Sequence, residues 1–188
     1  MRVLINMNMT KIALVIGFAS SITAGMAQAA TAPTSDQGGG QINFSGKIID
    51  APCSITTGDD STQTVDLGEV SKTALENGQT STPKNFTIKL EQCDVSTAGL
   101  SSVSAKFTGS KDATDPTMLG ITGDAKGAGI VLTDGANQPI ALNSASSAQD
   151  IQNGSNTLTF SAYLKSDGAS AVVPGTFTST ADFTLAYK

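Results

Sequence analysis

Residues 38–48 read Gly-Gly-Gly-Gln-Ile-Asn-Phe-Ser-Gly-Lys-Ile and decide the interpretation of the whole chain. Apolar or glycine positions alternate with polar ones, so an extended strand would present one set of residues on a single face: Gly40, Ile42, Phe44, Gly46 and Ile48. Residues 30–40 ahead of it are rich in Ala, Thr, Ser and Gly, a composition that cannot bury itself. Residues 41–49 are therefore either the first strand of a β-domain or a segment that another surface must capture.

The C-terminus carries a second alternating segment. After Gly175, the positions Ala181, Phe183, Leu185 and Tyr187 alternate with small or polar residues up to Lys188. Such a period of two predicts a strand with one buried face. Taken by itself, the pattern is that of a last strand paired inside its own domain.

The composition between these two ends favours short strands and turns. The 188 residues contain 19 glycines, no tryptophan and only 14% charged side chains, and Asp-Gly and Asn-Gly pairs separate the apolar runs. Residues 109–129 are weakly patterned, and we expect a loop or one short helical turn there. The pattern fits an antiparallel immunoglobulin-like sandwich, with these candidate strands: 41–49, 63–67, 85–93, 102–107, 129–132, 139–142, 157–165 and 176–187.

The first 29 residues are typical of a secretory signal peptide. Arg2 and Lys11 precede an apolar run of about thirteen residues, too short to span a bilayer, and Ala27-Gln28-Ala29 offers a cleavage site. Cleavage after Ala29 is expected, with Ala30 as the alternative. Export to an oxidising compartment predicts that the only two cysteines, Cys53 and Cys93, form a structural disulfide.

The charged and catalytic residue types exclude several functions. The chain has no histidine, so a Ser-His-Asp or Cys-His catalytic site and a histidine zinc site are ruled out. A formal net charge of −5 argues against nucleic-acid and anionic-lipid partners. A carboxylate pair for glycoside hydrolysis, or a calcium site, would have to come from acids scattered through turns: Asp59, Asp60, Asp94, Asp112 and Asp115. We expect no enzyme activity, no cofactor and no metal.

Together, several of these features resemble pilin subunits of the chaperone-usher type, similar to the major rod subunits of type 1 and P fimbriae. The resemblance runs over the whole mature chain. Its carriers are the N-terminal alternation, Gly46 to Ile55 with Cys53, Val65 to Gly68, Phe86 to Cys93, the glycine fourteenth from the end, Gly175, and the penultimate Tyr187.

The resemblance implies an all-β fold: an incomplete immunoglobulin-like sandwich that lacks its last strand and is completed by a donor strand from a neighbouring subunit. It divides the chain into a signal peptide (1–29), a donor-strand extension (30–49) and a pilin domain (50–188). The donor residues are then Gly40, Ile42, Phe44, Gly46 and Ile48, with Gly46 at a shallow pocket and Ile48 at the terminal pocket where exchange begins. The residues at the groove edge, which would also contact the chaperone, are then Gly175, Phe183, Leu185, Tyr187 and Lys188. Basic residues of the chaperone would anchor the terminal carboxylate of Lys188.

The resemblance also implies the partners and the destination. These are identical neighbouring subunits, a periplasmic pilus chaperone, an outer-membrane usher and tip adhesin or adaptor subunits, with no nucleic acid and no membrane insertion after signal cleavage. The product would be an extracellular fimbrium on the bacterial surface, reached through the periplasm. A minor adaptor or a carbohydrate-binding adhesive subunit is the alternative. The mature chain, about 159 residues long, leaves no room for the separate lectin domain of a tip adhesin.

Overall fold

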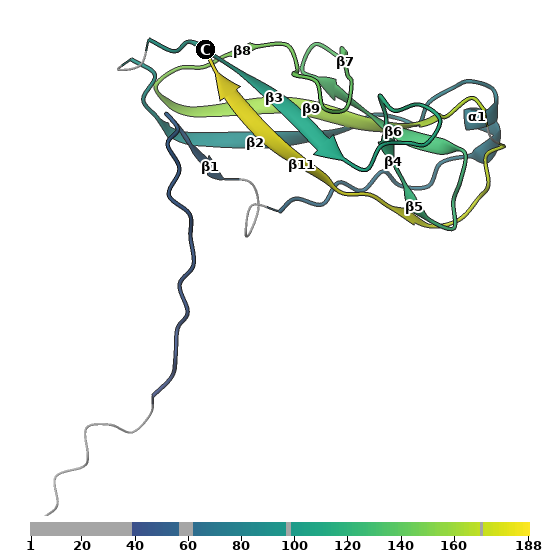
Figure 1. Cartoon of the computed structure of the whole chain (residues 1–188), viewed down its shortest axis with the longest axis horizontal. Helices are drawn as coiled ribbons and strands as arrows, with labels where there is room; N and C mark the ends of the chain where they lie inside the picture. The colour runs from purple at the N-terminus through teal and green to yellow at the C-terminus, as the bar shows by residue number, and fades with distance from the viewer. Residues whose placement is uncertain (1–38, 57–61, 97–98, 170) are drawn as a thin grey trace, which may run out of the picture. The chain divides into compact units, whose positions relative to one another are not determined.

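The computed structural model describes residues 39–56, 62–96, 99–169 and 171–188. The chain divides into two units, Met1–Gly46 and Lys47–Lys188, which are considered separately. In the first unit, residues 39–46 belong to no helix or strand and are all exposed. The second unit carries three antiparallel sheets, one of them of only two short strands, and one short helix (Figure 1).

The larger sheet has the strand order β1-β2-β9-β6-β4, with β7 paired to β6 beside β4. All its pairings are antiparallel, and the long central strands β2 and β9 keep a regular register from Lys84↔Ala162 to Leu90↔Asn156. The bounds are β1 Ser54–Thr56, β2 Lys84–Cys93, β4 Leu119–Gly120, β6 Ala128–Asp134, β7 Pro139–Ile140 and β9 Gly154–Ser166.

The smaller sheet has the order β11-β3-β8. Beside it, a two-stranded pair joins β5 to β10, and the five-residue helix α1 lies between β1 and β2 in the chain. The bounds are β3 Ser102–Gly109, β8 Gln149–Asp150, β11 Ala181–Tyr187, β5 Thr122–Gly123, β10 Phe177–Thr178 and α1 Lys72–Glu76. No helix in the described part of the chain is long and apolar enough to cross a membrane.

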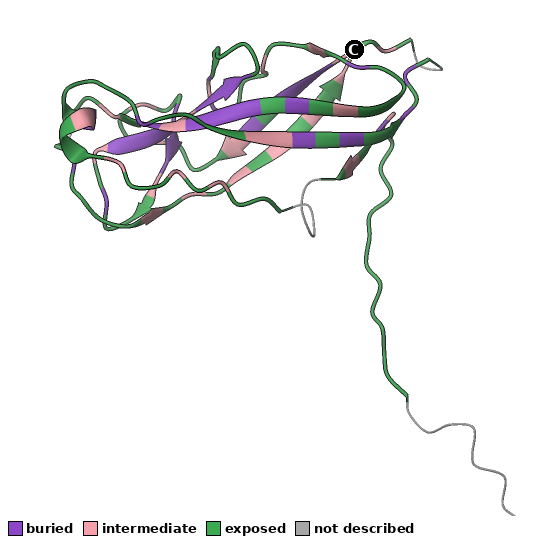
Figure 2. Cartoon of the chain, turned by 180° about the vertical axis from the view of Figure 1, so that it is seen from behind, coloured by how far each residue is buried: buried purple, intermediate pink, exposed green. Residues whose placement is uncertain are grey.

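The core lies between the two sheets and is centred on aromatic rings. Phe107 of β3 packs edge-to-face on Phe160 of β9 with ring centroids 5.2 Å apart, and Phe86 of β2 contacts both rings at 6.0 and 5.7 Å. Phe107 and Phe160 are buried, whereas Phe86 is only half-buried. Figure 2 shows the buried positions concentrated along the middle strands, with exposed ones alternating along the edge strands.

The structure confirms the predicted all-β class and the strands with the longest alternating patterns, but it corrects several segments. Residues 63–67 and the described extension form no strand, because an alternating pattern needs a partner edge before its backbone can pair. The segment 176–187 is broken at Ser179–Thr180 into β10 and β11, which belong to different sheets. Residues 109–129 contain the strands β4 and β5 as well as turns. The helix α1 and the short strands β1, β4, β5 and β8 lie outside the predicted set because they are too short to show a period, whereas β7 falls within the predicted strand 139–142.

The predicted disulfide is confirmed. Cys53 and Cys93 are bonded across 40 residues of chain and are both buried. The amide of Asp94 also donates a hydrogen bond to the carbonyl of Pro52 at 2.9 Å. The two bonds fasten the segment just before β1 to the end of β2.

Asp134, at the end of β6, holds the neighbouring loops through a buried carboxylate. Its oxygens accept hydrogen bonds from the amides of Ala136 (3.0 Å) and Gln138 (2.9 Å) and from the hydroxyl of Ser147. Burial by itself raises the pKa of Asp134, but these hydrogen bonds outweigh it and hold the pKa below its usual range. The ionised form is therefore preferred by the folded state.

This preference predicts a pH dependence of stability. A carboxylate with a depressed pKa in the folded state stabilises the fold above its unfolded-state pKa, and the contribution is lost as the pH falls through the folded-state pKa. In urea unfolding followed from pH 6 to pH 2, Asp134→Asn is expected to show a smaller loss of stability than the wild type. The exposed Asp182→Asn serves as the control, and equal acid sensitivity of the wild type and Asp134→Asn would contradict the assignment.

Candidate functional site: an open sheet edge

The smaller sheet has one open edge, and it is formed by β11. This strand pairs with β3 over all seven of its residues, from Ala181↔Gly109 to Tyr187↔Val103, and with no other strand in the described part of the chain. The main-chain N–H and C=O groups on its outer side therefore have no ladder partner there. Such an edge is a template for another strand.

The opposite edge of this sheet is closed by residues 143–151. The amide of Asn143 donates a hydrogen bond to the carbonyl of Phe107 (2.8 Å), and β8 pairs with the start of β3. Ser146 and Ala105 form two hydrogen bonds: the Ser146 amide donates to the Ala105 carbonyl (2.7 Å), and the Ala105 amide donates to the Ser146 hydroxyl (3.0 Å). The hydrogen bond between Ser147 and Asp134 ties this segment to β6 of the larger sheet, so β3 is covered on the side away from β11.

The inward side chains along β11 are incompletely covered. Ala181, Phe183, Leu185 and Tyr187 are all half-buried, whereas their inward-facing neighbours on β3, Val103, Ala105 and Phe107, are buried. Phe183 reaches the core through Phe107, with ring centroids 6.5 Å apart. Half-buried apolar side chains packed against the core come from other segments too: Ile55, Leu67, Val70 and Phe86. Along β11 the hydrophobic core is therefore incompletely covered, and one further strand beside β11 would complete it.

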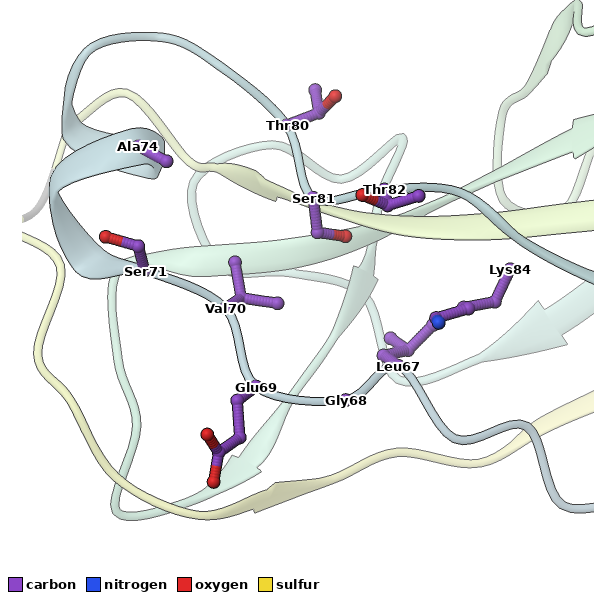
Figure 3. Close-up of a pocket in the computed structure, with 10 residues that line it drawn as sticks. All are labelled: Leu67, Gly68, Glu69, Val70, Ser71, Ala74, Thr80, Ser81, Thr82 and Lys84. Atoms are coloured by element: carbon purple, nitrogen blue, oxygen red, sulfur yellow. The ribbon is translucent and has the colours of Figure 1, made fainter.

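A cavity of about 310 Å³ lies between residues 67–71, α1 and residues 80–84. Its lining mixes apolar side chains such as Leu67 and Val70 with the charged Glu69 and Lys84. In Figure 3 Val70 points toward Ser81, and the carboxylate of Glu69 points away from the other lining residues. Residues 62–70, which lead into it, form no strand pairing with the described residues.

The predicted donor residues are exposed. Ile42, Phe44 and Ile48 have exposed fractions of 76%, 90% and 101%, and a Cβ built on Gly40 or Gly46 would contact nothing within 4 Å. None of these five residues lies in a strand, so no sheet in the described part of the chain contains them. Within the folded domain the exposed large hydrophobic residues are few, and Val173 is one of them, at 45%.

The two ends of the last segment have local structural roles. At Gly175 a Cβ would lie 2.6 Å from the amide nitrogen of Ala125 and 2.7 Å from the Cβ of Asp124, so only glycine allows this close approach of two backbones. The carbonyl of the next residue, Thr176, accepts hydrogen bonds from the amides of Asp124 and Ala125. At the C-terminus, a carboxylate oxygen of Lys188 accepts the amides of Ser101 (2.8 Å) and Ser102 (3.0 Å).

The acids considered for hydrolysis or calcium binding serve as turn acceptors. Asp112 accepts hydrogen bonds from the amides of Thr114 and Asp115. Asp115 accepts hydrogen bonds from the amide and the hydroxyl of Thr117, and the bond from the hydroxyl is the largest cause of the lowered pKa of Asp115. Asp94 accepts the hydroxyl of Ser96, whereas Asp59 and Asp60 lie outside the described residues. The described residues contain no group of three His, Cys, Asp or Glu side chains suited to a metal ion.

The family model described as fimbrial protein matches residues 42–188, most of the chain. The chain belongs to the fimbrial protein family. The pilin is 52% identical to the Fimbria A protein of Serratia marcescens over 84% of this chain and 89% of that one. It is 45% identical to the Major MR/P fimbria protein of Proteus mirabilis over 97% of this chain and the full length of the relative.

Solved structures agree with this assignment. The pilin superposes on the P pilus rod subunit PapA with a TM-score of 0.65 and 31% identity, over 73% of this chain and all of that one. A chaperone-usher pilus subunit gives a TM-score of 0.71 and 32% identity, over 84% and 100% of the two chains. The fold is thus the immunoglobulin-like pilin fold, and the chain is a structural subunit of the major pilin class, which replaces the adaptor or adhesive alternative.

The predicted site residues fall into two groups in the pilin. Phe183, Leu185, Tyr187 and Lys188 lie together on or directly after β11, whereas Gly175 packs against Asp124–Ala125 near β5. The sequence reasoning missed Phe86, Leu67 and Val70 as half-buried residues packed against the core. All three lie in apolar patterns, but the pattern does not reveal that their cover is incomplete. It also missed Ser101 and Ser102, whose amides hold the C-terminal carboxylate and carry no side-chain signal.

Proposed function

We propose that this pilin polymerises by donor-strand exchange, in which residues 40–48 of one copy fill the open edge beside β11 of the next. The observation that carries the proposal is β11 itself, an edge strand whose inward side chains are half-buried. Residues 40–48 have the matching property, since their apolar side chains occupy alternate positions and are exposed. Edge hydrogen bonds would provide affinity, and alternate side chains in pockets would provide specificity.

The expected energy of this pairing is large. Burying Ile42, Phe44 and Ile48 contributes about 1.5 to 3 kcal/mol each, or roughly 5 to 9 kcal/mol before the cost of ordering the segment. Main-chain hydrogen bonds along β11 add to this. Because the extension sits on the same chain as the groove but fills another copy's groove, the contact is head-to-tail and generates a fibre.

The delivery route is proposed on the same basis. Residues 1–29 act as the signal peptide, residues 30–49 as the donor extension and residues 50–188 as the pilin domain. In the periplasm a chaperone strand covers the β11 edge, because an exposed hydrophobic edge is an aggregation hazard, and an outer-membrane usher exchanges it for the donor strand. The subunit then becomes part of an extracellular fimbrium with tip adhesin or adaptor subunits. This role is assembly, without a catalytic step.

A peptide experiment tests the proposal. A synthetic peptide of residues 38–50 is expected to bind residues 30–188 purified as a monomer, and the Gly46→Leu peptide is expected to bind at least about tenfold more weakly, because a bulky side chain would collide at a shallow position of the groove. The matched control is Ser45→Leu, which changes the adjacent residue on the outward face. Equal binding of the Gly46→Leu and wild-type peptides in a calorimetric titration would contradict the proposed register.

A further inference from the structure

The hydroxyl of Tyr187 is a buried polar group without a partner. Its oxygen is inaccessible to bulk water and forms no hydrogen bond, the one such side-chain atom found among the described residues. Other buried polar groups are paired: Thr133 with Ser161 at 2.5 Å, and Ser81 with the amide of Leu164 at 2.9 Å. An unpaired buried hydroxyl is unfavourable, and proteins keep few of them. A partner that arrives on binding would remove this cost.

The position of Tyr187 is fixed from its main chain. It is the last residue of β11 and pairs with Val103, and the next residue is held at three points, since the Lys188 amide donates to the Ser102 carbonyl (2.9 Å) and its carboxylate accepts from Ser101 and Ser102. Desolvation raises the pKa of Tyr187, in keeping with a hydroxyl held away from water. With its backbone fastened at this end of the strand, Tyr187 borders the position that a strand entering beside β11 would occupy.

The proposed donor segment offers only main-chain polar groups on the face that enters the groove. Its inward side chains are the hydrocarbons Ile42, Phe44 and Ile48 and the bare Gly40 and Gly46. All strand pairings in the folded domain are antiparallel. An antiparallel segment 40–46 matches the seven residues of β11 in length and brings Gly40 next to Tyr187. At a glycine, no Cβ shields the main chain from a neighbouring side chain.

We propose that the Tyr187 hydroxyl hydrogen-bonds the main chain of the incoming strand of a second copy at the glycines around Gly40. The inference rests on the proposed donor-strand function and adds a residue that recognises the seated strand. Tyr187 is then a positioning residue at the end of the groove. A strand whose glycines are replaced by larger residues would fill the same groove but leave this hydroxyl unpaired.

Tyr187→Phe tests the proposal because it removes one oxygen and keeps the ring. In urea unfolding, free Tyr187→Phe subunit is expected to be as stable as the wild type or more stable, because no bond is lost. Its affinity for the peptide of residues 38–50 is expected to fall about tenfold, because the bond made on binding is missing. Tyr163→Phe is the matched control, since the chain's other tyrosine lies half-buried on β9, and its peptide affinity is expected to stay within twofold of the wild type.

Three outcomes would overturn the inference. If Tyr187→Phe binds the peptide as tightly as the wild type, the hydroxyl makes no bond to the strand, while the proposed function stands. If the variant destabilises the free subunit as much as it weakens binding, the hydroxyl is paired before binding and acts only structurally. If the wild-type subunit fails to bind the peptide at all, both the proposed function and this inference are wrong.

Discussion

Subunits without residues 30–48 are expected to form no fibres, although their domain should fold with the same core and the same open edge. The deletion removes Ile42, Phe44 and Ile48, and with them the roughly 5 to 9 kcal/mol of apolar burial that would hold one copy in the groove of the next. It leaves intact the disulfide and every strand of the folded domain. Electron microscopy of the product released by cells that express the deleted subunit alone is the direct measurement.

A shorter deletion provides the control. Removing only residues 30–37 keeps the alternating segment and is expected to leave fibres, because those eight residues carry no apolar period. Long fibres from subunits lacking 30–48 would show that the alternating segment is not the connection between copies. Short fibres from the 30–37 deletion would instead assign part of the connection to the extreme N-terminus of the mature chain.

The same deleted subunit should also act as a chain terminator. It retains an open β11 edge and so can receive a strand, but it has none to give. Mixed with full-length subunits, it is expected to shorten fibres in proportion to its mole fraction. If it has no effect on fibre length, then either the groove does not accept a strand or the deletion prevents entry to the assembly route. Binding of the peptide of residues 38–50 to the deleted subunit distinguishes these two cases.

Local patterns predicted the long strands because their alternation extends over many residues, as in β2 with Ile88 and Leu90 buried and Lys89 exposed between them. They could not predict β4 or β5, in which two residues pair only because a distant segment lies beside them. The break between β10 and β11 was equally hidden, since Phe177 and Phe183 share one alternating phase but lie in different sheets. Short strands are products of tertiary contact, which a single sequence does not display.

The candidate site was predictable to a similar degree and for the same reason. The alternating phase identifies Phe183, Leu185 and Tyr187 as one face of a strand, but it does not distinguish a complete core from an open one. That distinction comes from the half-burial of these side chains beside fully buried neighbours on β3. Gly175 is a second example, because its importance depends on the backbone of Asp124–Ala125, which is 50 residues earlier in the chain.

Breaking the disulfide with Cys53→Ala/Cys93→Ala is expected to lower the free energy of unfolding by about 3 to 4 kcal/mol, because it closes a loop whose ends are 40 residues apart. Alanine is preferable to serine, since both positions are buried and a serine hydroxyl there would add its own cost. This loss is a large share of the free energy of unfolding for a domain with an open core, because such a domain gains less from apolar burial than a complete sandwich would. Urea unfolding followed by circular dichroism suits a chain without tryptophan.

The wild-type subunit under reducing conditions is the natural control and should unfold at the same urea concentration as the double variant. If oxidised and reduced wild-type subunits unfold together, the disulfide contributes nothing to equilibrium stability.

The position of the disulfide also predicts a role in the resistance of the fibre to pulling force. Cys53 lies at the point where the extension joins the domain, and its bond to Cys93 sends any pull on the extension directly to the end of β2, the neighbour of the long central strand β9. A fibre of double-variant subunits should therefore yield at lower force than the wild-type fibre, because only the hydrogen bond between Asp94 and Pro52 and the three paired residues of β1 would carry the load.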